Sequence, residues 1–181
     1  MARLRRDWYL EGWSREYCET DGKTRMVWKY TGEYFRYELS PRGLRRLKAA
    51  CALLTVLMAA LWFHLSMLRV AGREFFFVGA EWFLCIIPFM VLILGAASFL
   101  TVRERMTYRA MYGAYKRCRY GSFILLALLA LTIAGEIVFL CLYGSQVNLR
   151  REILWLAGVA VCFGCDLALV LLLRRYPPQI E

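Results

Sequence analysis

Residues 122–143 read SFILLALLALTIAGEIVFLCLY, and residues 153–173 read ILWLAGVAVCFGCDLALVLLL. Each stretch is long enough to cross a hydrocarbon layer of about 30 Å as a helix, and neither contains Lys or Arg. Each nevertheless carries one carboxylate, Glu136 in the first and Asp166 in the second. An ionisable side chain at such depth is rare, so both residues are candidates for a functional role.

Two further apolar stretches precede this pair, at 49–68 and 82–102. The hydrophobic content of 60% is well above that of a typical soluble domain. We therefore predict a membrane all-α fold, a bundle of four transmembrane helices built as two hairpins. The first stretch begins too late to be a cleaved signal peptide, so we expect it to be retained as a span. The predicted divisions are a segment 1–48, a membrane domain 49–173 and a tail 174–181.

Basic residues flank the predicted spans unequally. Twelve Lys and Arg side chains flank the span ends that share a side with both termini, and four flank the opposite ends. The positive-inside bias therefore predicts that both termini are cytoplasmic, in a plasma or inner membrane. The formal net charge of +10 suits anionic lipid headgroups on the cytoplasmic side, and we expect the lipid bilayer rather than nucleic acid as the partner of these charges.

Residues 13–40 alternate between apolar and polar side chains with a period of two. Asp21-Gly22 and Thr31-Gly32 are two-residue turn signals within this stretch, so it is predicted to form a small cytoplasmic three-stranded antiparallel meander. In this register one face gathers a set of aromatic and apolar side chains, which includes Trp13, Tyr17, Met26, Trp28, Phe35 and Tyr37. Three strands are near the lower limit for independent stability. The face is therefore expected to pack on its own chain or to dock a partner.

The connection 103–120 between the second and third spans has a helical period. Thr107 is a plausible N-cap, and four apolar or aromatic residues follow at helical spacing, namely Tyr108, Met111, Tyr112 and Tyr115. Basic residues occupy much of the remaining surface. The pattern predicts an amphipathic helix that lies in the plane of the headgroups.

The intramembrane polar residues fall at two predicted depths. At a rise of 1.5 Å per residue, Glu136 lies roughly 10 Å from the outer interface and Asp166 roughly 12 Å from the inner one. The two carboxyls are therefore not expected to touch. Glu136 is level with His64 of the first span, and Asp166 is nearer Thr132. Because burial disfavours the charged form of a carboxyl, these residues are candidates either for proton carriers or for hydrogen-bonded packing between helices.

Seven cysteines are present, and neither outer connection contains one. This distribution is typical of a protein without structural disulfides. Cys162-Phe-Gly-Cys165 lies in the fourth of four spans, and in this it resembles the membrane thiol oxidoreductases related to vitamin K epoxide reductase. The resemblance covers these four residues and the number of spans, and it implies a redox pair. That family relays electrons through outer-loop cysteines, which this sequence does not have.

The sequence has no phosphate-binding glycine loop and no recognisable nucleophile–base pair. We therefore expect a non-enzymatic accessory, regulatory or docking subunit of a membrane complex, without a cofactor. Its partner would be another membrane protein or a second copy of the chain. One alternative is a small proton-coupled transporter or channel component that uses Glu136, Asp166 and His64. A second alternative is a thiol oxidoreductase that uses Cys162 and Cys165.

Overall fold

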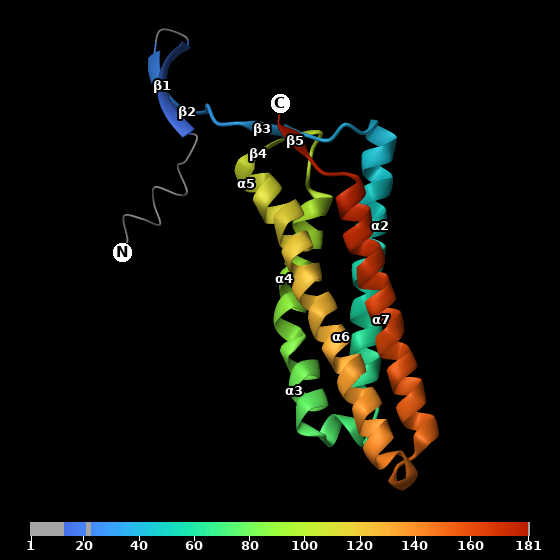
Figure 1. Cartoon of the computed structure of the whole chain (residues 1–181). Helices are drawn as coiled ribbons and strands as arrows, with labels where there is room; N and C mark the ends of the chain where they lie inside the picture. The colour runs from blue at the N-terminus through green and yellow to red at the C-terminus, as the bar shows by residue number, and fades with distance from the viewer. Residues whose placement is uncertain (1–12, 21–22, 181) are drawn as a thin grey trace, which may run out of the picture.

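The computed structural model describes residues 13–20 and 23–180. Four long helical stretches run along one another, and two small antiparallel sheets lie together at one end (Figure 1). We call this the strand-bearing end. The opposite end, the loop end, consists of the connections 68–75 and 144–148.

Each long helical stretch is long enough and apolar enough to cross a membrane. The helices in chain order are α2 (Pro41–Met67), η1 (Gly72–Glu74), α3 (Phe76–Leu84), α4 (Ile86–Leu100), α5 (Tyr108–Met111), the π-helical η2 (Tyr112–Lys116), α6 (Arg117–Tyr143), η3 (Gly144–Gln146) and α7 (Leu149–Arg175). Consecutive pieces form single stretches over Phe76–Leu100 and over Tyr108–Gln146. The four predicted apolar spans fall within these stretches to within two residues.

The helices extend beyond the predicted spans because local signals begin and end them. At the start of α2, Ser40 is the N-cap and its side chain accepts a hydrogen bond from Gly43 N at 3.1 Å. Pro41 occupies the first helical position, where its fixed φ and missing N–H are both tolerated. Polar caps therefore add about two turns to the apolar stretch at this end.

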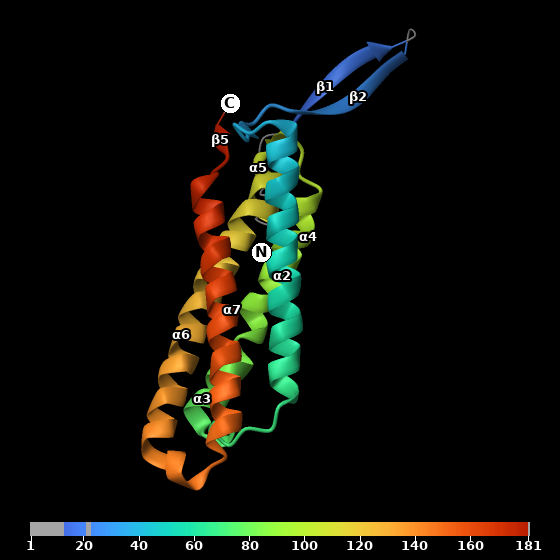
Figure 2. The same ribbon diagram turned by 90° about the vertical axis from the view of Figure 1, so that its right-hand side faces the viewer.

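The bundle core is a seam of residues spaced alternately three and four apart. In α6 the buried positions include Leu125, Leu129, Thr132, Glu136 and Phe139. In α7 they include Glu152, Trp155, Val159, Cys162, Asp166 and Leu169. This is the spacing with which two helices interlock side chains along a shallow left-handed crossing. α6 contacts α4 and α7, and α2 contacts the same two helices, as the two views show (Figures 1 and 2).

The N-terminal hairpin has the predicted register. β1 (Trp13–Thr20) pairs antiparallel with β2 (Lys23–Tyr30), from Thr20 opposite Lys23 to Trp13 opposite Tyr30. The Asp21-Gly22 dipeptide was the stronger of the two turn signals because it tolerates positive φ at both central positions. This part of the meander is confirmed.

The predicted pairing of the third strand of the meander is wrong. β3 (Tyr34–Arg36) does not continue the first sheet but lies in the centre of a second one, between β4 (Arg105–Thr107) and β5 (Gln179–Ile180). Phe35 and Tyr37 are only 7% and 2% exposed, and the Tyr37 ring packs edge-on against Phe99 of α4 at 6.0 Å. These two side chains are buried against the bundle instead of on the face of a thin sheet, which removes more apolar surface from water.

The prediction of a separate interfacial helix in the connection 103–120 is also wrong. Thr107 is an N-cap as predicted, since its hydroxyl accepts from Ala110 N at 3.4 Å, but the helix then continues through η2 into α6 (Figure 1). Met111 and Tyr115 are buried in the bundle core, and Tyr115 donates a hydrogen bond to Leu173 O of α7. The amphipathic pattern reflects packing against neighbouring helices at the strand-bearing end.

Candidate functional site

The structure separates the residues of the predicted intramembrane polar site. Glu136, Asp166 and Thr132 are each 0% exposed, whereas His64 lies on the exposed side of α2 next to the buried Leu65. His64 therefore does not join Glu136 in the bundle interior. The buried carboxyls instead form two sites at different levels of the bundle.

The first site is a pair of carboxyls at the loop end. Glu136 of α6 faces Glu152 of α7, and both approach Gly72 in η1. Glu152 accepts hydrogen bonds from Ala71 N at 2.8 Å and from Gly72 N at 3.4 Å. Within the described part of the chain neither oxygen of Glu136 has a hydrogen-bond partner. A Cβ on residue 72 would overlap the Glu136 carboxyl, so any larger residue there would require the Glu136 side chain to move.

The loop that supplies these N–H donors is fixed to the end of α2. Arg73 Nη1 donates to three carbonyls of the last turn of that helix and the residue after it, including Ser66 O at 2.6 Å. Trp82 Nε1 donates to Ser66 Oγ at 3.1 Å and adds a second tie from α3. The Arg73 guanidinium thus caps a helix C-terminus, where a positive charge is favourable, and it holds η1 above the carboxyl pair.

The second site lies deeper towards the strand-bearing end. Asp166 of α7 lies beside Ser122 of α6, and both of its oxygens and the Ser122 hydroxyl are buried with no hydrogen-bond partner among the described residues. Thr132 does not supply one, because its hydroxyl donates to Leu128 O of its own helix at 2.9 Å. The two sites are 14 residues apart along both helices, which corresponds to about 21 Å.

Both proposed redox cysteines are free thiols on α7. Cys162 is 1% exposed and lies close to Cys85, at the junction of α3 and α4, as well as to Asp166 one turn away. Cys165 is half-buried. A reactive thiolate is typically found next to solvent and positive charge; Cys162 is buried, and its ionisable neighbours among the described residues are Cys85, Cys165 and Asp166. Across residues 13–20 and 23–180, no group of three or more His, Cys, Asp and Glu side chains could hold a metal ion.

The hairpin face retains part of the predicted docking set. Trp13 and Met26 are 40% and 50% exposed, while Phe35 and Tyr37 have moved to the bundle core. The side chains of Tyr17 and Trp28 lie outside the described residues. The hairpin projects away from the bundle (Figure 2).

A series of ring contacts connects this hairpin to the second sheet. The Tyr30 ring lies edge-on to Trp13 at 5.4 Å and to Tyr34 at 5.1 Å. The Arg105 guanidinium lies over the Tyr34 ring at 3.9 Å. The Tyr30 hydroxyl also accepts a hydrogen bond from Tyr108 N at 3.2 Å. The base of the hairpin is therefore held against the bundle by contacts that leave its outer part projecting.

Sequence reasoning missed Glu152, Gly72 and Ser122. Glu152 follows Arg150 and Arg151 and therefore resembled an ordinary charged residue at the edge of a span. The signal that could have found it is its spacing from Asp166. Glu152 and Asp166 are two heptads apart, and so are Ser122 and Glu136, which puts each pair on a single seam.

Comparisons with known proteins assign no relative to the chain. No protein-family model matches it, and no curated protein or solved structure is significantly similar.

Proposed function

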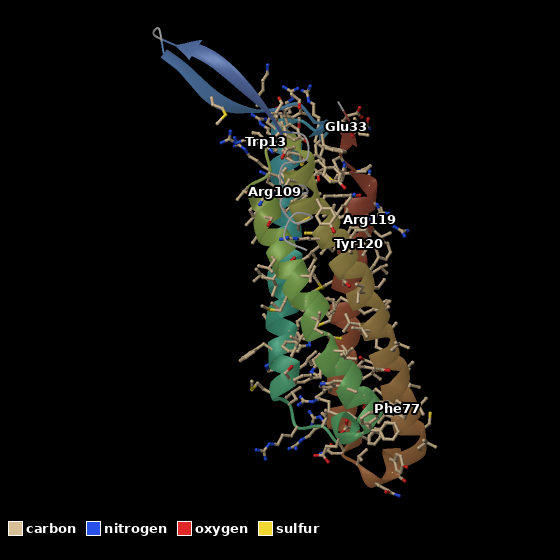
Figure 3. The ribbon with its side chains drawn as sticks, turned by 90° about the vertical axis from the view of Figure 1, so that its left-hand side faces the viewer. Trp13, Glu33, Phe77, Arg109, Arg119 and Tyr120 are labelled. Atoms are coloured by element: carbon tan, nitrogen blue, oxygen red, sulfur yellow. The ribbon has the colours of Figure 1, made fainter. Side chains whose placement is uncertain are left out.

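We propose that the chain is an integral membrane protein whose four long helices span the bilayer and whose strand-bearing end is cytoplasmic. The four helices have the length and hydropathy of spans, and many outward-facing side chains are large and apolar, for example Leu53, Phe83 and Leu131. Twelve Lys and Arg residues flank the span ends at the strand-bearing end, against four at the loop end, which is the distribution that the positive-inside bias describes. Phe77, which is 62% exposed, lies near the loop end (Figure 3), where aromatic residues suit the interface.

Its function, in this proposal, is that of an accessory subunit that docks another protein through the β1–β2 hairpin. The observation that carries the proposal is that β3 pairs in the second sheet and not with β2. Among the described strands β2 pairs only with β1, so no described strand lies along its other edge, and Trp13 of β1 and Met26 of β2 are exposed on the hairpin. An isolated two-stranded hairpin is at best marginally stable in water, and an open edge accepts a further strand. The fitting partner is an extended segment of another protein chain.

Site-specific photocross-linking in native membranes tests this docking. A photoreactive residue at Met26 is expected to give one discrete protein adduct, and Trp13→Asp is expected to abolish it because it places a charge within the apolar contact. The matched position is Phe77, which is also exposed but lies at the loop end. An adduct of twice the chain mass identifies a second copy as the partner. Equal labelling from Met26 and Phe77, or labelling of lipid alone, contradicts the docking function.

A second candidate function rests on the pair formed by Glu136 and Glu152. Two facing carboxylates in a water-poor site repel each other, and neither oxygen of Glu136 has a hydrogen-bond partner among the described residues. A small proton-coupled transporter or channel component would use Glu136 and Asp166 as proton carriers. In this version Glu152 takes the place of His64 as the neighbour of Glu136.

Reconstitution of the purified full chain in liposomes distinguishes this function. A pH gradient is expected to drive a flux that Glu136→Gln and Asp166→Asn abolish. The matched control is Glu74→Gln, which changes an exposed carboxyl at the same end and is expected to leave the flux unchanged. A wild-type flux equal to that of protein-free liposomes rules out transport. The redox alternative is tested in the same preparation, where loss of quinone-linked thiol oxidation in Cys162→Ser/Cys165→Ser would support it.

A further inference from the structure

A cavity of about 490 Å³ opens at the strand-bearing end, between the last turn of α4 and the start of the third helical stretch. Three arginines and three hydroxyl-bearing residues make up its polar lining, namely Ser98, Thr101, Arg103, Arg105, Thr107 and Arg109. None of the described residues that line it is acidic. Glu104, between two of the arginines in sequence, is exposed and lies outside the lining. The cavity thus has the charge of an anion site.

The acceptors that would repel an anion here are already engaged. A helix C-terminus carries partial negative charge on its last carbonyls, and α4 ends at this cavity. Lys48 Nζ from α2 donates to Leu100 O at 3.1 Å and also to Val102 O. The Thr101 hydroxyl donates to Ser98 O at 2.8 Å. With these carbonyls engaged, they repel an anion in the cavity less than free carbonyls would.

An exposed aliphatic stripe leads from the cavity down the outside of α4. Ser98 lines the cavity, and the residues 4, 7 and 11 positions before it lie on the same face of the helix. They are Leu94, Val91 and Ile87, which are 55%, 37% and 66% exposed. The stripe runs towards the middle of the proposed membrane span. A ligand with an anionic head and an apolar tail matches the arginine-lined cavity followed by the aliphatic stripe. A free phosphate would use only the cavity.

We propose that this cavity binds the phosphate-bearing headgroup of an anionic phospholipid, with an acyl chain along α4. The proposal rests on the membrane placement given above and adds a defined lipid site to it. Arginine suits the headgroup because its planar fork donates two parallel hydrogen bonds to phosphate oxygens. The Arg105 guanidinium is already held over the Tyr34 ring at 3.9 Å, which reduces the entropy lost on binding.

The first test compares two triple variants of equal charge in the detergent-solubilised full chain. Arg103→Gln/Arg105→Gln/Arg109→Gln empties the cavity of charge. Arg117→Gln/Arg119→Gln/Arg174→Gln removes the same charge from exposed positions at the same end but outside the cavity, and Arg109 and Arg119 lie on different sides of the bundle (Figure 3). Retention of phosphatidylglycerol is measured by native mass spectrometry against phosphatidylcholine with the same acyl chains.

Each arginine near a lipid phosphate contributes roughly fivefold to affinity, so the cavity triple is expected to weaken phosphatidylglycerol binding about a hundredfold. The control triple is expected to lose only about threefold, because its three side chains lie outside the cavity and act on the headgroup only through screened long-range attraction. Equal losses in the two triples would show diffuse attraction to a basic surface and overturn the site. Displacement of the lipid by inorganic phosphate or glycerol phosphate at equal concentration would assign the cavity to a soluble phosphate and overturn the lipid proposal.

The second test blocks the cavity without changing any charge. Gly113 lines it, and a Cβ built there meets nothing within 4 Å. Gly113→Leu is therefore expected to fold and to weaken phosphatidylglycerol binding at least tenfold by steric exclusion. Gly164→Leu is the matched control, because it also adds a side chain in open space on an exposed helix surface. Unchanged binding in Gly113→Leu overturns the proposal. Because both tests are done in detergent, their results do not depend on which way the chain is oriented in a membrane.

Discussion

Gly95 sets the distance between α4 and α6. A Cβ at this position would lie 2.8 Å from the backbone nitrogen of Cys118 and 2.9 Å from its Sγ. Gly95→Ala therefore forces backbone to move, and we expect it to lower the free energy of unfolding by about 1–3 kcal/mol. Gly164→Ala is the control, since its Cβ meets nothing within 4 Å and the helix gains up to about 1 kcal/mol from alanine. Denaturant unfolding in detergent measures both, and equal effects would contradict the close approach at Gly95.

Tyr37 has a buried hydroxyl with no hydrogen-bond partner among the described residues. Burial, assisted by the neighbouring Tyr115, raises the pKa of Tyr37 above its ordinary value of 10.0. Above pH 10 the unfolded chain releases this proton before the folded one does, so the folded state loses stability as the pH rises, by up to about 1.4 kcal/mol per pH unit. Below that pH the stabilisation of the folded state by this group is fully present.

Tyr37→Phe is expected to remove this part of the alkaline loss of stability. At neutral pH the variant should be as stable as the wild type or slightly more stable, because it removes an unpaired buried polar group. Stability is measured from pH 7 to pH 11, with Tyr143→Phe as a control at a position that is 42% exposed. Identical slopes for the two variants above pH 10 would show that the Tyr37 hydroxyl is hydrated.

The residues of the polar sites show where sequence reasoning runs out. The sequence identified Glu136 and Asp166 as unusual and put them at different depths, because depth follows from position in a span. It did not find the side of α2 on which His64 lies. That helix is apolar on all sides over its span, so the hydropathy pattern does not show which of its faces is buried. The buried face, which includes Met58 and Leu65, is known only from the packing of the neighbouring helices. The partners of Glu152 are backbone N–H groups about 80 residues away, and backbone groups leave no mark in a sequence.

At the scale of elements, the heptad seam of α6 and α7 decides which leucines matter. Leu129 is 1% exposed and lies on the seam, whereas Leu131, two residues later, is 53% exposed. Leu129→Ala is expected to cost about 2–5 kcal/mol through the cavity it leaves. Leu131→Ala is expected to cost less than about 0.5 kcal/mol. Unfolding in detergent compares the two, and similar losses would show that α6 packs with a different face.

The two predicted N-terminal strand pairings had different outcomes because one is local in sequence and the other is not; the Asp21-Gly22 turn itself lies outside the described residues. The β1–β2 register depends on Asp21-Gly22 and on residues within 17 positions of each other, so the sequence contains nearly all the information. β3 has the same alternation of apolar and polar residues. This alternation predicts that the Phe35 side chain is buried, but it does not predict which strand pairs with β3. The strands that do, β4 and β5, come from residues 105–107 and 179–180. Pairings over such separations cannot be read from periodicity.

At the scale of the whole molecule, the termini of the described chain lie at one end of the bundle (Figure 1). If that end is cytoplasmic, a reporter enzyme that works only in the cytoplasm is expected to be active when it is fused after Glu181. A reporter enzyme that works only outside the cytoplasm is expected to be active when it is inserted at Gly144 of the loop end. The reason is the excess of basic residues at the strand-bearing end. Both reporters are assayed for enzymatic activity that depends on the compartment. The reverse pattern contradicts the orientation, and activity of both in one compartment contradicts the spans.

The second sheet also has a consequence for the timing of assembly. Its three strands come from segments before the first long helix, between the second and third, and after the fourth. It therefore cannot be completed until residue 180 has left the ribosome and every long helix has been made. The β1–β2 hairpin needs only the first 30 residues. A protein partner that binds the hairpin could thus bind the nascent chain well before the second sheet forms. Formation of that sheet, in contrast, requires that all four long helices have been synthesised.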